Sequence, residues 1–189
     1  MDAKLPLLIT MGDPNGVGPE ISLKAYLKAS RKIKTPMAIV GDLPVLEQAA
    51  KLLKIRKHLV FADSPEAVAE VAKQGIPVID GGVRFEEKVQ PGKMTKEAGR
   101  ASIGWVRTAT ALCLLKRARA IVTAPLCKES VEKTVPEFQG HTEFIGEMCG
   151  DPHPVLCLVH GNWVVAHVST HVSLRDACDL VKRERIEKV

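Results

Sequence analysis

The stretch TMGDPNGVGPEI, residues Thr10–Ile21, places three glycines between an apolar run and a helical segment. A dinucleotide-binding loop would follow the pattern G-x-G-x-x-G. Gly16 and Gly18 match its start, but no glycine stands in the third position, and no Gly-Lys-Ser/Thr ending of a Walker loop is present. The acidic side chains Asp13 and Glu20 would also repel a phosphate. The stretch therefore predicts a tight strand-to-helix turn, in which glycines supply positive φ angles, rather than a phosphate cradle.

Apolar runs alternate with helical segments along the chain, a pattern typical of an α/β fold with a mostly parallel sheet. Two further apolar runs flank Gly161-Asn162 and predict a hairpin. Small residues crowd positions 98–104, which predicts close packing of a long helix against another element. The expected strands are 6–11, 37–42, 58–63, 76–80 and 120–125, and the expected helices are 19–30, 44–53, 64–73, 95–119, 128–133 and 173–188.

The composition is that of an ordinary globular protein, with 46% hydrophobic and 26% charged residues and a net charge of +5. Aromatic residues make up only 4%, too few for base-stacking platforms, and no long basic run occurs. Five cysteines form no CxxC pair, which favours a reduced intracellular protein. No signal peptide or apolar stretch of membrane-spanning length is evident. We expect a cytoplasmic protein that binds neither nucleic acid nor a membrane.

MGDPNGVGPEI resembles the N-terminal signature of the 4-hydroxythreonine-4-phosphate dehydrogenase family of vitamin B6 synthesis. It is also similar to the shorter GDGIGPE loop of isocitrate and isopropylmalate dehydrogenases. Three more motifs agree with that family in the same order: IVTAPLCKESV (Ile121–Val131), GHTEFIGE (Gly140–Glu147) and STHVSLRDA (Ser169–Ala177). Together the four motifs cover nearly the whole chain.

The resemblance implies an isocitrate/isopropylmalate dehydrogenase-like fold with two α/β domains and mostly parallel sheets. We expect the first domain to include residues 1–90 and the second residues 91–189, with the loop 81–92 crossing between them. Family members are longer, and this chain ends in charged helical sequence without a closing strand. The expectation is therefore an N-terminal portion with the C-terminal part missing.

Three residues are expected to bind substrate. In the family the two positions after the glycine of GHTEF bind substrate, which implies this role for His141 and Thr142. The residues alone allow another interpretation, in which Thr142 only caps a helix. Lys128, in TAPLCK, is the best cation for a substrate phosphate, although a solvated surface lysine would give the same pattern. Asp13 and Asn15 are expected to shape the mouth of the active site without catalytic roles.

His171 is expected to bind a metal, because the histidine of the STH motif is one of three metal ligands in the family. The other two ligands, several phosphate-binding residues and most cofactor contacts would lie beyond Val189. Arg175 and Asp176 are expected to fix this loop or to hydrogen-bond the ligand. The implied cofactors are NAD or NADP and a divalent metal (Zn, Mg or Co), and no cofactor-binding residue can be assigned.

The implied reaction is oxidation and decarboxylation of 4-phosphohydroxy-L-threonine to 3-amino-2-oxopropyl phosphate by a homodimeric enzyme. Because two metal ligands are absent, we expect this chain alone to be inactive. One alternative is a sister dehydrogenase acting on 4-phospho-D-threonate or D-erythronate. Another is a non-catalytic module that binds phosphorylated ligands.

Cys149, His153, Cys157 and His160 allow a third alternative, a structural zinc site in a nucleic-acid-binding module. On a strand, however, Cys157 and His160 would point to opposite faces and would not easily converge on one ion.

Overall fold

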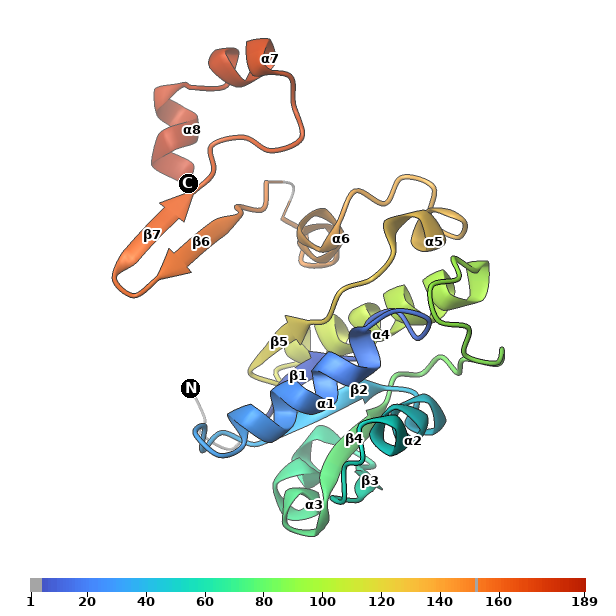
Figure 1. Ribbon diagram of the computed structural model, residues 1–189. Helices are drawn as coiled ribbons and strands as arrows, with labels where there is room; N and C mark the ends of the chain where they lie inside the picture. Colours follow the sequence, from blue (N-terminus) through green and yellow to red (C-terminus); the bar gives the residue numbers. More distant parts are fainter. Residues whose placement is uncertain (1–4, 152) are drawn as a thin grey trace. The chain divides into compact units, whose positions relative to one another are not determined.

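The computed structural model describes residues 5–151 and 153–189 (Figure 1). The chain divides into two compact units, Met1–His141 and Thr142–Val189. The first unit is built on a five-stranded sheet with the order β3-β4-β2-β1-β5, in which every pair of neighbours is parallel. This confirms the predicted α/β class. The strands are β1 (Leu7–Thr10), β2 (Met37–Gly41), β3 (Leu59–Phe61), β4 (Ile76–Asp80) and β5 (Ala120–Thr123).

A helix follows each strand and returns the chain to the start of the next parallel strand. α1 packs on β1 and β2, whereas α4 packs on β1, β2 and β5. The chain moves in one direction along the sheet from β1 to β2 and in the other from β4 to β5. Because such crossovers are right-handed, α1 and α4 lie on opposite faces (Figure 1). The helices are α1 (Gly18–Ala29), α2 (Leu43–Leu52), α3 (Val68–Gln74) after a 3₁₀ turn (Pro65–Ala67), α4 (Lys96–Leu114) and α5 (Lys128–Glu132).

The centre of the sheet forms the core of the first unit. All five residues of β2 are buried, as expected for a strand that is covered on both faces. Leu8 and Ile39 are fully buried between the layers, together with Trp105 of α4. Each such side chain contributes about 1.5–3 kcal/mol of burial free energy. The parallel pairing of these buried apolar strands therefore brings their carboxyl ends together at one edge of the sheet.

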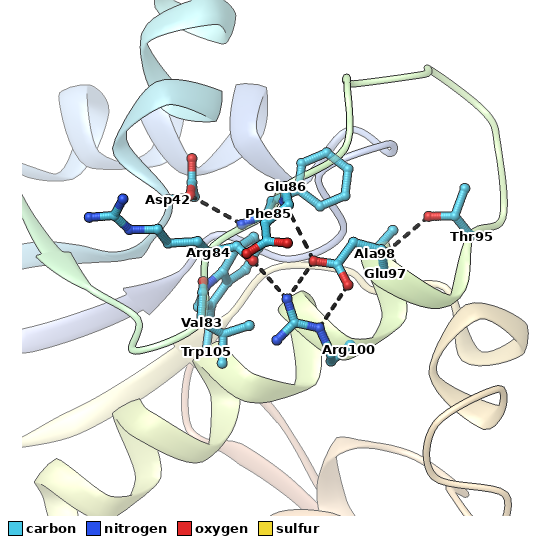
Figure 2. A network of polar contacts seen from close by, with 10 residues as sticks. All are labelled: Asp42, Val83, Arg84, Phe85, Glu86, Thr95, Glu97, Ala98, Arg100 and Trp105. Atoms are coloured by element: carbon cyan, nitrogen blue, oxygen red, sulfur yellow. Dashed lines mark hydrogen bonds and ion pairs between the residues drawn. The ribbon is translucent and has the colours of Figure 1, made fainter.

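The segment 81–94 contains no helix or strand, as predicted, and it is fastened to α4 (Figure 2). The indole Nε1 of Trp105 donates to the Val83 carbonyl over 2.8 Å, and the Arg100 guanidinium donates to the Arg84 carbonyl over 2.9 Å. Glu97 forms an ion pair with Arg100 on the same helix. These bonds give the long loop a fixed path along the helix.

The crowding of small residues at the start of α4 has the predicted consequence. A side chain at Gly99 would overlap the backbone of Ser130, which lies in α5. The two helix backbones therefore approach as closely as glycine allows. α5, which carries Lys128, is thereby set against a helix of the core.

The second unit contains an antiparallel hairpin and short helices. β6 (Cys157–His160) and β7 (Trp163–Ala166) pair around a turn that begins at Gly161, whose φ is +56°. This confirms the predicted hairpin. α6 (His141–Met148) begins at the last residue of the first unit, and the remaining helices are α7 (Leu174–Asp179) and α8 (Arg183–Lys188).

The predicted single helix 173–188 is two helices, so that prediction is wrong in its length. The backbone is extended at Lys182, between α7 and α8. No residue of either helix is buried. Since most helical stability in proteins comes from packing one face against a core, such segments gain little from continuing as one long helix.

The two compact units do not divide where we placed the domain boundary, between residues 90 and 91. α4 and β5 belong to the first unit, because β5 pairs with β1 along its whole length. The contact boundary falls instead at His141 and Thr142. The pairing of β5 explains the difference, since a strand cannot be separated from the sheet that it completes.

Candidate functional site

β1 and β5 are neighbours in the sheet, and the helices that follow them pack on opposite faces: α1 follows β1, and α5, which follows β5, packs against α4. Their boundary is therefore a switch point of the sheet. In parallel α/β sheets, ligands bind beyond the carboxyl ends of strands at such a point. Two loops leave the sheet there, residues 11–17 after β1 and residues 124–127 after β5. The amide of Asp13 donates to the Pro125 carbonyl over 3.0 Å. Two of the four sequence motifs therefore meet at this edge.

Gly12 permits this meeting. Its φ is +77°, in the left-handed region that favours glycine, and a Cβ there would overlap the Pro125 carbonyl oxygen. The glycine is needed both for the turn and for the close approach of the second loop. This confirms the interpretation of the first motif as a tight strand-to-helix turn.

Asp13 is 6% exposed and its turn is closed by local hydrogen bonds. Its Oδ1 accepts from the Asn15 amide over 2.8 Å, and its main-chain carbonyl accepts from the Gly16 amide over 3.1 Å. Burial raises the pKa of Asp13, while the neighbouring amides of Asn15, Cys127 and Gly16 oppose that rise. The bond from its own amide to Pro125 links the turn after β1 to the loop that precedes α5.

Asn15 connects the same turn to a third segment. Its side-chain Oδ1 accepts from the Gln90 amide over 2.8 Å, and its Nδ2 donates to the Lys93 carbonyl over 3.1 Å. The side chain is almost completely buried. Asn15 therefore has a structural role here, holding the long loop against the turn.

A pocket of about 330 Å³ lies beside the opening motif. Most of its lining is apolar, and its one charged residue is Glu20. A phosphate would find no cation there. The pocket agrees with the conclusion from the sequence that TMGDPNGVGPEI does not cradle a phosphate.

Lys128 and His141 both belong to the first unit. Lys128 is the first residue of α5 and its side chain is exposed. Burial, and secondarily the positive charge of Lys128, lowers the pKa of His141. The Nε2 atom of His141 is buried and has no hydrogen-bond partner among the described residues. A neutral imidazole with a free ring nitrogen beside an ammonium group can bind a polar anionic ligand.

Thr142 and His171 lie in the second unit and are considered within it. Thr142 is half-buried in the first turn of α6, directly after His141. The next residue, Glu143, has its Oε1 3.9 Å from Nε2 of His171. The GHTEF and STH motifs therefore approach each other in this unit, as a shared site requires.

His171 is exposed and has a φ of +55°. Few residues other than glycine adopt this left-handed conformation, so the backbone is unusual at the expected metal ligand. The residues that follow form a cap: Ser173 Oγ accepts from the Asp176 amide over 3.2 Å and donates to the Asp176 carboxylate over 2.6 Å. Asp176 thus takes part in the cap that begins α7, in the manner of a capping box.

The described residues alone do not provide a complete metal site. In 5–151 and 153–189, no group of three or more His, Cys, Asp or Glu side chains is placed to hold an ion. His171 with Glu143 offers two of the required donors. The same result gives no support to the zinc alternative, whose members Cys149 and Cys157 are exposed free cysteines.

Three buried features escaped the sequence analysis. The hydroxyls of Thr10 and Ser130 are buried without a hydrogen-bond partner among the described residues. The bond from the Asp13 amide to the Pro125 carbonyl also had no signal, since the two residues are far apart in the chain. The Asp13-x-Asn15 spacing is typical of a turn in which aspartate accepts from the amide two residues on, and could have indicated that local bond.

Comparisons with known proteins agree with the four motifs. Residues 32–189 match the model of the pyridoxal phosphate biosynthetic protein PdxA. The chain is 35% identical to a D-threonate 4-phosphate dehydrogenase of Cupriavidus necator, over 94% of this chain and 53% of that protein. It is 33% identical to a 4-hydroxythreonine-4-phosphate dehydrogenase of Prosthecochloris aestuarii, over 92% of this chain and 52% of that protein.

The structure agrees as well. A crystal structure of a 4-hydroxythreonine-4-phosphate dehydrogenase from Burkholderia phymatum superimposes with a TM-score of 0.85 at 29% identity, covering 98% of this chain and 56% of that one. The chain thus spans about half the length of the curated relatives it matches. Among the described residues, no helix has the length and apolar character to cross a membrane. On the family match and the motifs, the chain belongs to the PdxA family.

Proposed function

We propose that the protein is an NAD(P)-dependent, metal-dependent dehydrogenase that converts 4-phosphohydroxy-L-threonine to 3-amino-2-oxopropyl phosphate. The observation that carries the proposal is the meeting of the first two motifs at the carboxyl ends of β1 and β5, where the Asp13 amide donates to the Pro125 carbonyl three residues before Lys128. The names of several relatives and of the superimposed structures support the class of reaction. The enzyme would be a cytoplasmic homodimer.

In this reaction the substrate's carbinol carbon gives a hydride to NAD⁺ or NADP⁺ while its hydroxyl loses a proton. The resulting β-keto acid loses CO₂, and the carbon that is left takes up a proton. A divalent metal (Zn, Mg or Co), when bound, would supply a Lewis acid for the substrate oxygen. His171 would be one of its ligands, and a complete site needs donors that the described residues do not offer.

The residues of this chain would bind and orient the substrate. The Lys128 ammonium group is exposed and can pair with the phosphate as a point charge. Because the pKa of His141 is lowered, its imidazole is neutral at pH 7 and can donate or accept one hydrogen bond at Nε2. Thr142, in the first turn of α6, would add a hydroxyl.

A second candidate substrate is 4-phospho-D-threonate. Two relatives that are 35% identical to the chain carry the D-threonate 4-phosphate name. The two substrates share the phosphate and the oxidised carbon, and they differ in an amino or hydroxyl group at the neighbouring carbon. The pair Lys128 and His141 would serve either of them.

The test is turnover by the complete gene product with each substrate and each nicotinamide cofactor. Lys128→Met should raise KM roughly tenfold to a hundredfold, as expected for the loss of a charged hydrogen bond. Lys24→Met, which removes an exposed lysine from α1, is the matched control and should leave KM unchanged. Unchanged kinetics in Lys128→Met, or no turnover of either substrate by the unaltered protein, would refute the proposal. The 189-residue chain alone should show little turnover.

A further inference from the structure

The sheet has a further switch point, between β2 and β4. α2, which follows β2, packs against α1, whereas α4, which follows β4, lies on the opposite face of the sheet. A pocket of about 300 Å³ lies there, beyond the carboxyl ends of β2, β3 and β4. Among the described residues, none lines both this pocket and the one beside the opening motif. The pocket is therefore in a position where α/β sheets bind ligands, and the proposed function does not use it.

Arg84 brings an unpaired cation to this pocket. Its carbonyl accepts from the Arg100 guanidinium over 2.9 Å, which fixes the backbone at this position. Its own side chain is exposed and extends away from Arg100, on the side where Asp42 lies (Figure 2). Within residues 5–151 and 153–189 the Arg84 guanidinium forms no ion pair. It is therefore available to an anionic group of a ligand.

Asp80 offers the opposite charge at the end of β4. Its Oδ1 accepts from the backbone amide two residues later over 2.8 Å, which orients the carboxylate and leaves Oδ2 available. Although Asp80 and Arg84 line one pocket, the described part of the chain contains no ion pair between them. The carboxylate of Asp42 is occupied, since its oxygens accept from the amides of Val45 and Phe85. One free negative and one free positive group thus line the same pocket.

Much of the remaining lining is apolar. Phe61, at the end of β3, is 47% exposed, and Val78 and Leu43 extend the apolar surface. The volume lies at the lower end of the range of about 300–1,000 Å³ that is usual for small-molecule pockets. The pocket therefore suits a small ligand with a short hydrocarbon group better than a dinucleotide.

We propose that this pocket binds a free α-amino acid with an apolar side chain. The carboxylate of the ligand pairs with Arg84, its ammonium group pairs with Asp80, and its side chain contacts Phe61. Other ligand classes fit the charges less well. A phosphate would meet two carboxylates and one cation, and a simple amine would leave Arg84 without a partner. The inference does not rest on the proposed function, because it concerns a different pocket.

The first test is calorimetric titration of the complete gene product with L-leucine, L-valine, L-methionine and L-phenylalanine. At least one of them should bind with a Kd below about 1 mM. The matching amine and carboxylic acid, which for leucine are 3-methylbutylamine and 4-methylpentanoate, should bind at least about tenfold more weakly. No binding of any of these amino acids, or equal binding of an amino acid and its two analogues, would overturn the inference. Tighter binding of AMP or inorganic phosphate that depends on Arg84 would do the same.

Variants assign the binding to this pocket. Arg84→Met and Asp80→Asn should each weaken binding of the amino acid at least about tenfold, because each removes one charged partner. Arg31→Met and Asp63→Asn alter exposed residues that do not line the pocket, and Asp63 also follows a strand. They are the matched controls and should leave the Kd unchanged. Unaltered affinity in both pocket variants would place the ligand elsewhere and reject the inference.

Two checks complete the design. Lys128→Met should leave the affinity for the amino acid unchanged; a loss of affinity there would mean that the ligand binds at the proposed substrate site and would reject the inference. Both pocket variants alter exposed side chains and should keep a urea midpoint close to that of the unaltered protein. If a variant does not fold, NMR of the unaltered protein decides instead. The amino acid should shift the amide signals of residues 80–85, and an absence of shifts there would reject the inference.

Discussion

Two glycines of α4 allow a prediction in which two opposing effects can be compared in magnitude. Replacing glycine by alanine inside a helix stabilises it by about 1 kcal/mol. At Gly99 the new methyl group would overlap the carbonyl of Ser130 in α5, which cannot move unless that helix moves. At Gly104 it would meet the side chain of Val83, with Cγ2 at 2.6 Å and Cβ at 3.2 Å; the methyl group can rotate away, and the Cβ contact asks for a shift of only a few tenths of an ångström.

Overpacking against a fixed neighbour costs typically 1–3 kcal/mol and occasionally more. The gain in helix propensity is the same at both positions, so the neighbour decides the outcome. At Gly99 the new Cβ would lie 1.9 Å from a backbone oxygen, so the cost there lies in the upper part of this range, about 2–3 kcal/mol. We expect Gly99→Ala to lower the free energy of unfolding by roughly 1–2 kcal/mol, and Gly104→Ala to change it by less than about 1 kcal/mol. Because α5 carries Lys128, Gly99→Ala should also weaken binding of the phosphorylated substrate.

Urea unfolding followed by tryptophan fluorescence measures both variants. Trp105 is fully buried in the first unit, whereas Trp163 of the hairpin is 78% exposed, so the signal reports the unit that contains both glycines. An unfolding free energy for Gly99→Ala equal to or above that of the unaltered protein would show that α5 does not pack against α4 as described. Equal losses at the two glycines would have the same meaning.

Three further predictions concern pH and the long loop. The hydrogen bond from Arg117 lowers the pKa of Glu66 to about 2, so the unfolded chain binds the proton first as pH falls. The difference in urea midpoint between the unaltered protein and Glu66→Gln should therefore be present at pH 7 and shrink from about pH 4.5 toward pH 2. Burial lowers the pKa of His141 below 6.5, so the unfolded chain binds this proton first and the stability of the protein should fall as pH drops through 6.5. His141→Gln should lack this loss of stability in urea titrations. Trp105→Phe removes the 2.8 Å bond to the Val83 carbonyl and part of the buried side chain; we expect a loss of roughly 2–4 kcal/mol in unfolding followed by circular dichroism, and no loss would refute the fastening of the loop.

Elements that bury an apolar run were predictable from the sequence, because the pattern of their residues indicates both whether they form a helix or a strand and that they are buried. The strand Met37–Gly41 is an example. The hairpin was predictable for another reason, since the turn residues at Gly161 mark it, and its apolar strands are exposed. The long helix was placed correctly at its start, where Thr95 accepts from the Ala98 amide over 3.1 Å. Its end was missed, since it stops at a left-handed lysine, Lys116, which local propensity does not indicate.

The candidate site was predictable only in its members. The motifs supplied Asp13 and Lys128, but the loops that hold them meet through the bond from the Asp13 amide to the Pro125 carbonyl. This bond joins segments more than a hundred residues apart, which no local pattern encodes.

The level ends of β1 and β5 bear on how this protein can tolerate insertions and deletions. Thr10 lies opposite Thr123 in the sheet. The loops that follow β1 and β5 therefore begin side by side, independently of the length of the chain that joins the two strands. Extra residues in a surface loop between these strands would cost only chain entropy and leave the two loops in place. Deleting a single residue inside β5 would turn the following side chains of that strand to the opposite face and shift the loop that meets Asp13. The tolerance of the protein to length changes should therefore be lowest within the strands and helices of the sheet and highest in the surface loops that join them.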